Sequence, residues 1–539
     1  MGRSGARDTN WFVSGRLRAP SLCHNIAAVT TASHNKTGWT IPQLIFVAFL
    51  FLPLYLLFPS TNYDANGVIE AMWVESGTRF SPNHILYTFI GRVLYKAAQA
   101  FGFDVRAINA LQVFNAFCGA IAVALACGAF GSLGLSRRAV VAAAGLWGTS
   151  FIFWCYSTDV AYVTLASVFT AAALWCCAVL MKRSSHSLLF LLGLLISLAI
   201  LTFQMLIFLL PIFVWPLLRR RREATVAIVA TLVLLGFCYV GFGFSEGHTN
   251  PADLVRWVGS YAGGDIPEWG RFDMVRVGVA GGAAIRSFQW DVFEKPKDMF
   301  RTPLRPYVWR LGAGALFFVL LTLTTLFLSI QAYRDGKSRF LWLIGAYLLF
   351  WPFIIWFDPV ASYWFLIPNL FLCAAAGLAW QTWMSRPSGF AFIFTSISVM
   401  ATATFISWVW NKHIDPGVVG RKAECIAQMV KSNDLVIATD WTWPATLEYF
   451  HGVHPIQVID LAASLHDPDK VFNFLALGIQ KTREQHGRVF IVDPSSYTRQ
   501  DLDWLAEQAQ FTAEDFERYP GKILFQCEDA KFREVEEVQ

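Results

Sequence analysis

The chain has 539 residues, of which 55% are hydrophobic and only 15% charged, and its mean hydropathy is +0.45. Soluble globular chains carry about a quarter charged residues, so this composition excludes an ordinary soluble protein. The net charge of +5 is unevenly distributed, because the residues from Asn411 onward hold 13 Lys and Arg against 21 Asp and Glu, a net charge of −8. This acidic segment predicts a separate soluble unit and argues against nucleic-acid binding, which selects basic surfaces.

Residues 1–40 are polar and basic without a cleavable signal sequence, and we expect them to form a cytoplasmic tail. Apolar runs long enough to cross a bilayer recur after this tail and predict a polytopic α-helical membrane protein of about eleven spans. The expected spans lie at 41–58, 106–133, 138–156, 159–181, 187–203, 205–218, 224–244, 308–331, 339–356, 362–383 and 389–410. Residues 187–218 could instead form one helix kinked at Pro211, which would reverse the orientation of everything after it.

The charges of the short loops favour eleven spans. The loops that even-numbered spans would return to the cytoplasm are basic, as at Arg137-Arg138 and Arg219 to Arg222, whereas the opposite turns at 157–159 and 358–359 contain no Lys or Arg. This alternation is the positive-inside pattern. It predicts a membrane domain over 41–410 with outer loops at 59–105 and 245–307, followed by an extracytoplasmic domain over 411–539.

The first outer loop carries an acid directly after a span. Asp64 follows that span by six residues, and apolar positions between 65 and 73 recur with helical spacing, which predicts an interfacial helix with Glu70 on its opposite face. A second amphipathic helix is expected over 84–101, with His84 at its start. Asp64 can serve as a general base or simply cap the helix that follows it.

The C-terminal segment alternates short apolar runs, at 435–438, 456–461, 488–492 and 523–525, with helical patterns at 444–451, 469–485 and 499–510. Strands that alternate with helices predict a parallel sheet and therefore a small α/β domain. The domain has no GxGxxG fingerprint, which argues against a dinucleotide site. Cys425 and Cys527 can pair if the domain faces an oxidising space or remain free thiols.

Three motifs follow one another along the membrane domain. Asn62-Tyr63-Asp64 precedes the run SPNHILY at 81–87, YSTDVAY occupies 156–162, and SYWFLIP occupies 362–368. Together they resemble the glycosyltransferase-C superfamily, which uses polyprenyl-phosphate sugars and includes protein O-mannosyltransferases and the aminoarabinose transferases that modify lipid A. The third motif lacks the family's frequent Arg. The first loop also lacks a DxD motif, so no metal or other cofactor is supported.

The resemblance implies transfer of a sugar from a polyprenyl-phosphate donor to a lipid, glycan or protein acceptor on the outer face of the membrane. It implies Asp64 as the general base and Asp159 as a second carboxylate that holds the acceptor or tunes Asp64, although Asp159 could also cap the fourth span. Arg, Lys and His donors stabilise the departing phosphate. The residues expected to bind substrate or phosphate are Arg79, His84, Tyr87, Tyr162, Arg256 and Arg271, of which the arginines could instead contact lipid headgroups.

Two other classes of function stay open at this point. A transporter or flippase of a lipid-linked or glycan substrate would place charged or Gly/Pro-broken residues at the middle of the bilayer, where Gln204 and Pro211 are the candidates. A non-catalytic scaffold would not require polar residues in the first outer loop. A cytoplasmic N-terminus fits a bacterial inner membrane or the endoplasmic reticulum, and the absence of an Asn-x-Ser/Thr site after residue 410 favours the former.

Overall fold

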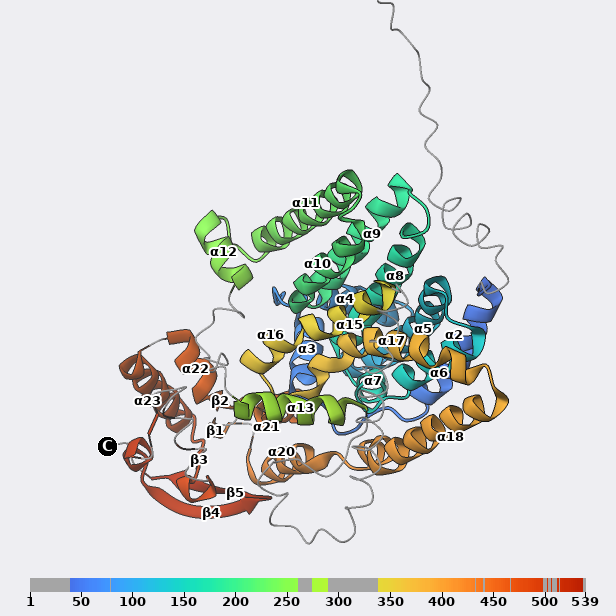
Figure 1. Cartoon of the computed structure of the whole chain (residues 1–539). Helices are drawn as coiled ribbons and strands as arrows, with labels where there is room; N and C mark the ends of the chain where they lie inside the picture. The colour runs from blue at the N-terminus through green and yellow to red at the C-terminus, as the bar shows by residue number, and fades with distance from the viewer. Residues whose placement is uncertain are drawn as a thin grey trace, which may run out of the picture.

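The computed structural model describes residues 39–259, 274–288 and 338–536, apart from residue 78 and several positions in the C-terminal domain (432, 440, 441, 466, 498–501, 503–505, 507–510 and 513). The described residues form a helical membrane domain and a smaller domain with a five-stranded sheet (Figure 1). The span expected at 308–331 and the predicted site residue Arg271 lie outside the described residues.

Among the described residues, six helices or helix pairs are long and apolar enough to cross a membrane, and a seventh candidate is a pair of helices bent by 60°. The six comprise α5 (Ala107–Leu133), α8 (Tyr162–Leu180), α11 (Arg221–Ser245), α15 (Ser338–Leu349) with α16 (Trp351–Trp356), α17 (Leu366–Met384) and α18 (Pro387–Thr404), and the bent pair is α6 (Arg137–Gly148) with α7 (Phe151–Thr158). Shorter apolar helical segments are α2 (Ile41–Leu56), α9 (His186–Thr202) and Gln204–Leu217, which contains α10 (Leu209–Val214). Every expected span among the described residues is therefore helical, while the number of eleven stays a prediction.

The chain reverses direction between α9 and α10. Phe203 has extended backbone angles that end α9, and the short helix Gln204–Phe208 leads into α10. After α10, Arg220 donates to the carbonyl oxygen of Leu180 at 3.2 Å, which returns the chain to the end of the bundle where α9 begins. A single helix kinked at Pro211 is therefore not formed, because the break lies at Phe203.

Loops that are expected on the same side of the membrane are joined by hydrogen bonds to one another or to neighbouring helix ends. At one end of the bundle Arg138 donates to the carbonyl oxygen of Ser385 at 2.8 Å, and Arg339 donates to the C-terminal end of α5. At the other end the amide of Ser60 donates to the carbonyl oxygen of Thr158 at 2.9 Å. The basic loops thus gather at one end, as their alternation predicts, while the compartment that each end faces stays a prediction.

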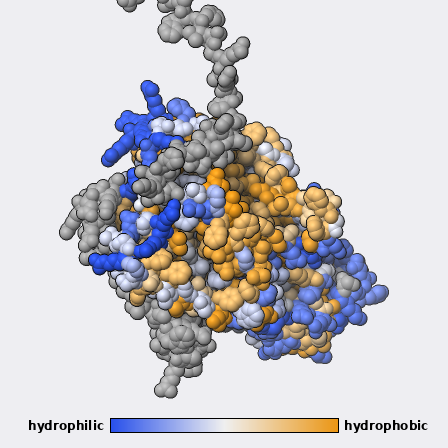
Figure 2. Space-filling view, turned by 90° about the vertical axis from the view of Figure 1, so that its right-hand side faces the viewer, coloured by the Kyte–Doolittle hydropathy of each residue, from blue (hydrophilic) through white to orange (hydrophobic). Residues whose placement is uncertain are grey.

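The outside of the membrane domain is apolar. Figure 2 shows a broad hydrophobic surface across the middle of one face, between hydrophilic areas. Helix α2 exposes Phe46 and Phe49, and α11 exposes Val233 and Phe237. Exposed large apolar side chains on this scale are what a lipid environment requires, because water would penalise them.

The helices of the two loops expected on the outer side are α3 (Ala65–Ser76), α4 (Ile85–Ala100), α12 (Pro251–Gly259) and α13 (Met274–Phe288). The expected helices after Asp64 and His84 are confirmed, but α3 does not present Glu70 to solvent. Glu70 is only 1% exposed, because α4 and α5 pack on α3 and the C-terminal domain covers it from the other side. The expectation that Glu70 faces away from the protein was therefore wrong.

The C-terminal domain is a mixed α/β unit. It contains α19 (Trp410–Ile414), α20 (Gly417–Met429), β1 (Leu435–Ala438), α21 (Thr442–His451), β2 (Ile456–Gln457), α22 (Val458–Leu465), α23 (Pro468–Glu484), β3 (Val489–Val492), β4 (Gly521–Cys527) and β5 (Ala530–Val535). The strand order is β2-β1-β3-β5-β4, with β2, β1 and β3 parallel. The domain also contains the short helical turns Pro494–Ser496 and Glu514–Arg518, and the membrane domain contains Trp215–Leu217, Ser362–Phe365 and Phe405–Val409.

An entirely parallel sheet was expected, and this is wrong for its last two strands. β4 and β5 form an antiparallel hairpin, and β5 also runs antiparallel to β3. The expected run at 523–525 is the middle of β4, whereas β5 was missed because charged residues interrupt its apolar pattern. The domain also contains a disulfide between Cys425 of α20 and Cys527 of β4, so the two cysteines are not free thiols.

Candidate active site

The turn that carries Asp159 is held by polar residues of α5. Asn115 donates through Nδ2 to the carbonyl oxygens of Asp159 at 2.7 Å and Ala161 at 3.1 Å. One turn earlier, Gln112 donates to the carbonyl oxygen of Ser60 at 2.7 Å. Both amide side chains are buried, and buried polar groups of this kind fix a unique arrangement because leaving them unpaired is costly.

Asp159 is fully buried and forms an ion pair with Lys412. Its side chain has no exposed surface, and Oδ2 lies 3.3 Å from Lys412 Nζ. Burial raises the pKa of Asp159, Lys412 opposes this shift, and the charge of nearby Asp64 adds to it. Asp159 ends α7, and its side chain does not cap α8. Its Oδ1 accepts a hydrogen bond from the Val160 amide at 2.8 Å, and its Oδ2 contacts Lys412.

Asp64 is the more accessible of the two carboxylates. It is half-buried at the N-terminus of α3, and its Oδ1 accepts a hydrogen bond from the amide of Asn66 at 2.9 Å. The expected helix cap is therefore present. The charge of Asp64 raises the pKa of both Asp159 and Lys412, so Asp64 lies within electrostatic range of the buried ion pair. An oxygen not committed to the cap can still accept a proton.

A second polar group lies between α3 and α4. His84 Nε2 contacts Glu70 Oε1, and Thr88 donates to Glu70 Oε2 at 2.9 Å. The His84 ring stacks on Tyr162 with centroids 4.5 Å apart. Nδ1 of His84 is buried and has no hydrogen-bond partner among the described residues.

An aromatic row joins this group to the third motif. The ring of Tyr162 lies 5.2 Å from that of Phe203, and Phe203 stacks on Trp364 at 5.3 Å. Tyr156 also meets Tyr363, with ring centroids 6.1 Å apart. The second motif at 156–162 therefore contacts both the first and the third, which are separated by almost 300 residues in the sequence.

The other described residues predicted to bind substrate or phosphate do not lie at the carboxylate cluster with a free polar group. Tyr87 has no exposed surface and donates to Asn115 Oδ1 at 3.3 Å, so it supports the Asp159 turn from behind. Arg79 is exposed at the start of the segment that leads to α4. Arg256 is exposed on α12 and lies 3.9 Å from Asp253. The structure brings neither arginine into the carboxylate cluster.

Sequence reasoning missed Lys412 and Glu70. Lys412 follows the last expected span on its outer side, where the positive-inside rule expects few cations, and this exception was a usable signal. Glu70 gave no such signal, because its position on a helical face suggested solvent. The described residues contain no group of three or more His, Cys, Asp or Glu side chains that could hold a metal ion.

The fold of most of the chain is similar to that of two solved enzymes. An oligosaccharyltransferase from Archaeoglobus fulgidus, AglB, aligns over 92% of this chain and 73% of its own at 14% identity, with a TM-score of 0.53. ArnT from Cupriavidus metallidurans in its apo state aligns over 92% of this chain and 98% of its own at 12% identity, with a TM-score of 0.52. The chain has the glycosyltransferase-C fold.

The glycosyltransferase-C fold agrees with the three motifs and their order. At these levels of identity the likeness concerns the fold alone, so residue roles rest on the geometry described above. One AglB structure, with a TM-score of 0.53, contains an inhibitory peptide and a dolichol-phosphate. No protein-family model and no curated protein sequence matches this chain.

Proposed function

We propose that this protein is an integral membrane glycosyltransferase that moves a sugar from a polyprenyl-phosphate donor to an acceptor hydroxyl or amide on the outer face of the membrane. The observation that carries the proposal is the pairing of two acids in different states at one end of the bundle. Asp159 is buried and neutralised by Lys412, whereas Asp64 beside it is half-exposed. A buried ion pair next to an accessible carboxylate is typical of a site that separates positioning from proton transfer.

In the proposed reaction Asp64 takes the proton from the acceptor. The acceptor heteroatom then attacks the anomeric carbon of the sugar, while the bond from that carbon to the phosphate oxygen breaks and the phosphate leaves with the electron pair. Direct attack would invert the anomeric configuration. Asp159 does not touch the substrate in this scheme; together with Lys412 it is a positioning residue that holds the outer turn against Asp64.

The departing phosphate needs a hydrogen-bond donor. His84 is our candidate, because Nδ1 is buried without a partner while Nε2 contacts Glu70. A donor fixed by a carboxylate and by stacking on Tyr162 would require little reorganisation during the reaction. We assign no role in phosphate binding to Tyr87, and the proposal includes no metal or other cofactor.

The test is transfer of a labelled sugar from polyprenyl-phosphate donors by the purified protein in nanodiscs. Asp64→Asn keeps the hydrogen bond to the Asn66 amide but removes the base, so we expect the rate to fall by about 10²- to 10⁴-fold. The control is Asp104→Asn, which changes an exposed acid in the same outer loop. Equal rates for wild type and Asp64→Asn would remove Asp64 from the mechanism. No transfer, together with transport of the donor across vesicles, would favour a flippase.

A further inference from the structure

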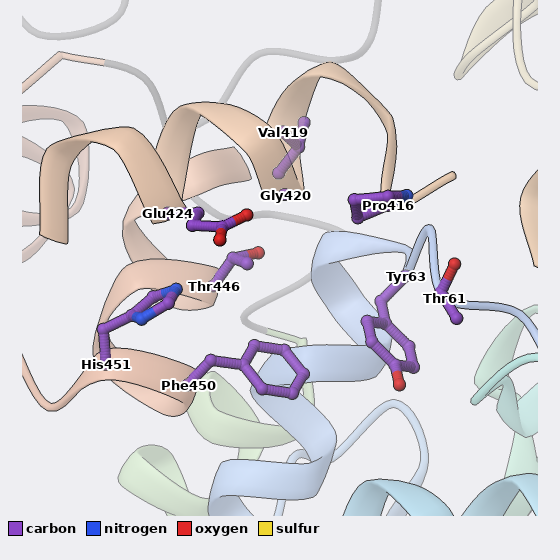
Figure 3. Close-up of a pocket in the computed structure, with 9 residues that line it drawn as sticks. All are labelled: Thr61, Tyr63, Pro416, Val419, Gly420, Glu424, Thr446, Phe450 and His451. Carbon is purple, nitrogen blue, oxygen red and sulfur yellow. The ribbon is translucent and has the colours of Figure 1, made fainter. Parts of the chain in front are cut away.

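A cleft lies between the first outer loop and the C-terminal domain (Figure 3). It has a volume of about 210 Å³ and lies between Tyr63 of the first loop, α20 around Glu424, and α21. From α21 it receives Thr446, Phe450 and His451. The transfer reaction proposed above uses none of these side chains.

Thr446 is a polar side chain of the cleft without a hydrogen-bond partner among the described residues. Thr446 is only 6% exposed, and its hydroxyl oxygen has no hydrogen bond within the described part of the chain. In Figure 3 the hydroxyl lies close to the Glu424 carboxylate and on the same side of the cleft as the His451 ring. A buried hydroxyl is unfavourable unless a ligand or water satisfies it, so this group marks a binding position.

The other wall of the cleft is aromatic. The rings of Tyr63 and Phe450 stack with their centroids 5.3 Å apart and their planes inclined by 23°. Phe450 keeps 37% of its surface exposed. An aromatic surface opposite a carboxylate and a hydroxyl suits a ligand with one apolar face and many hydroxyl groups, which is the character of a sugar ring.

The negative charge of the cleft and of the C-terminal domain limits which sugars can bind. The exposed Glu424 carboxylate enters the cleft, and the C-terminal segment carries a net charge of −8. A phosphorylated or carboxylated ligand would be repelled, whereas neutral hydroxyls or an amine can donate to Glu424. Tyr63 is also the residue before Asp64 in the chain, so a ligand in the cleft lies next to the proposed base.

We propose that this cleft binds a neutral or amino-bearing saccharide of the acceptor. This inference rests on the proposed glycosyltransferase function and extends it to the acceptor. Hydroxyl or amino groups of the sugar donate to Glu424 and exchange hydrogen bonds with Thr446, and the apolar face of the ring packs on Phe450. Most of the cleft lining comes from the C-terminal domain, whereas the donor's lipid lies in the membrane, so we assign the saccharide to the acceptor.

Binding can be measured without turnover, by saturation-transfer NMR on the full chain in nanodiscs. The probes are the methyl glycosides of glucose, mannose, glucosamine and N-acetylglucosamine. We expect at least one probe to receive saturation, and Glu424→Gln and Thr446→Val to weaken its binding by about tenfold, as for a lost hydrogen bond to a charged group or a buried partner. The matched control is Glu448→Gln, which alters a glutamate of α21 that pairs with His454 outside the cleft.

Several outcomes would overturn the inference. These are the absence of saturation for every glycoside, equal weakening in Glu448→Gln, or binding of unglycosylated peptides in place of sugars. An effect of Glu424→Gln on the KM for the donor, with the acceptor KM unchanged, would also overturn it, because it would assign the cleft to the donor sugar. If glycosides bind but Asp64→Asn leaves transfer unchanged, the role of Asp64 as base is refuted and the saccharide site in the cleft is supported. If Asp64→Asn abolishes transfer but no glycoside binds, only the saccharide site is refuted.

Discussion

Asp64 and Asp159 are the same kind of residue in two environments. One is half-exposed and accepts a single backbone hydrogen bond, while the other is fully buried against a lysine. Taking a carboxylate out of water is expensive unless a cation accompanies it. The pair of Asp159 and Lys412 therefore makes it possible to keep two acids side by side, with only one of them accessible to a substrate.

Lys412→Met tests this division of roles through pH. Burial raises the pKa of Asp159 and Lys412 opposes the rise, so removing the lysine leaves burial and the charge of Asp64 acting together. We expect the pKa of Asp159 to increase, the acid limb of the pH–rate profile to move to higher pH, and the rate at neutral pH to fall. Lys412→Arg keeps the charge and should restore most of the profile. An unchanged acid limb in Lys412→Met would show that Asp159 is not coupled to the reaction.

The sequence singles out Asp64, Asp159 and His84 as candidates, because acids and a histidine at the end of a span have few structural uses, and their catalytic roles stay predictions. It was not sufficient to find their partners. Lys412 is separated from Asp159 by 253 residues, and only the packing of the last helix brings the two together. Arg256 was selected for its charge, yet it lies exposed on α12, since charge alone does not distinguish a substrate contact from a surface residue.

At the scale of elements, α3 positions the site because it lies very close to the Asp159 turn. A Cβ atom at Gly67 would lie 2.6 Å from the carbonyl oxygen of Val160, closer than real contacts allow. Only glycine therefore lets the helix that Asp64 caps approach the turn that carries Asp159. The period of apolar residues predicted this helix correctly, but the pattern could not show that other helices would cover both of its sides.

Gly67→Ala should separate these two elements. We expect it to lower the free energy of unfolding by about 1–3 kcal/mol, as overpacking does, and to reduce transfer more than binding of the donor. The measurement is thermal unfolding together with the transfer rate in nanodiscs. Gly145→Ala in α6 is the control, because a Cβ there meets nothing within 4 Å and should be neutral or slightly stabilising. Equal behaviour of the two variants would contradict the close approach.

At the scale of the molecule, hydrogen bonds join the C-terminal domain to the first outer loop. Tyr449 of α21 donates to Glu75 of α3 at 2.6 Å, and Arg106 donates both to Glu75 and to the carbonyl oxygen of Tyr449. Composition predicted the two domains separately, whereas their interface depends on single residues far apart in the chain and could not be foreseen.

Docking of the two domains should weaken in acid. Burial alone would raise the pKa of Glu75, but hydrogen bonds from Arg106, Tyr449 and the Ala107 amide outweigh it, and the pKa is lowered. A carboxylate with a lowered pKa stabilises the docked state above its ordinary pKa and loses this effect as pH falls through the lowered value. Glu75→Gln should remove that acid dependence and increase protease cleavage between the domains at neutral pH. Cleavage that stays independent of Glu75 would contradict the contact.

The disulfide offers a test of orientation, which the fold alone does not provide. Cys425 and Cys527 are joined across 102 residues, and such bonds persist in oxidising compartments but are rare in the cytosol. The sequence predicts the C-terminal domain on the outer face from loop charges, an independent observation. If the disulfide forms and the domain lies on the outer face, protein taken directly from cells should yield the linked Cys425–Cys527 peptide in mass spectrometry. Free thiols are first blocked with an alkylating reagent.

The same mass-spectrometry experiment has an internal control, and removal of the disulfide should change the stability of the domain. The buried Cys176 and Cys177 should be recovered as unlinked thiols, because they lie within α8 away from any oxidant. Replacing Cys425 and Cys527 by serine should destabilise the C-terminal domain by about 2–4 kcal/mol, since the unfolded chain gains the freedom that the bond removes. Recovery of Cys425 and Cys527 as free, alkylated thiols would place the domain in the cytosol. It would then also place the proposed base on the wrong side for an extracytoplasmic acceptor.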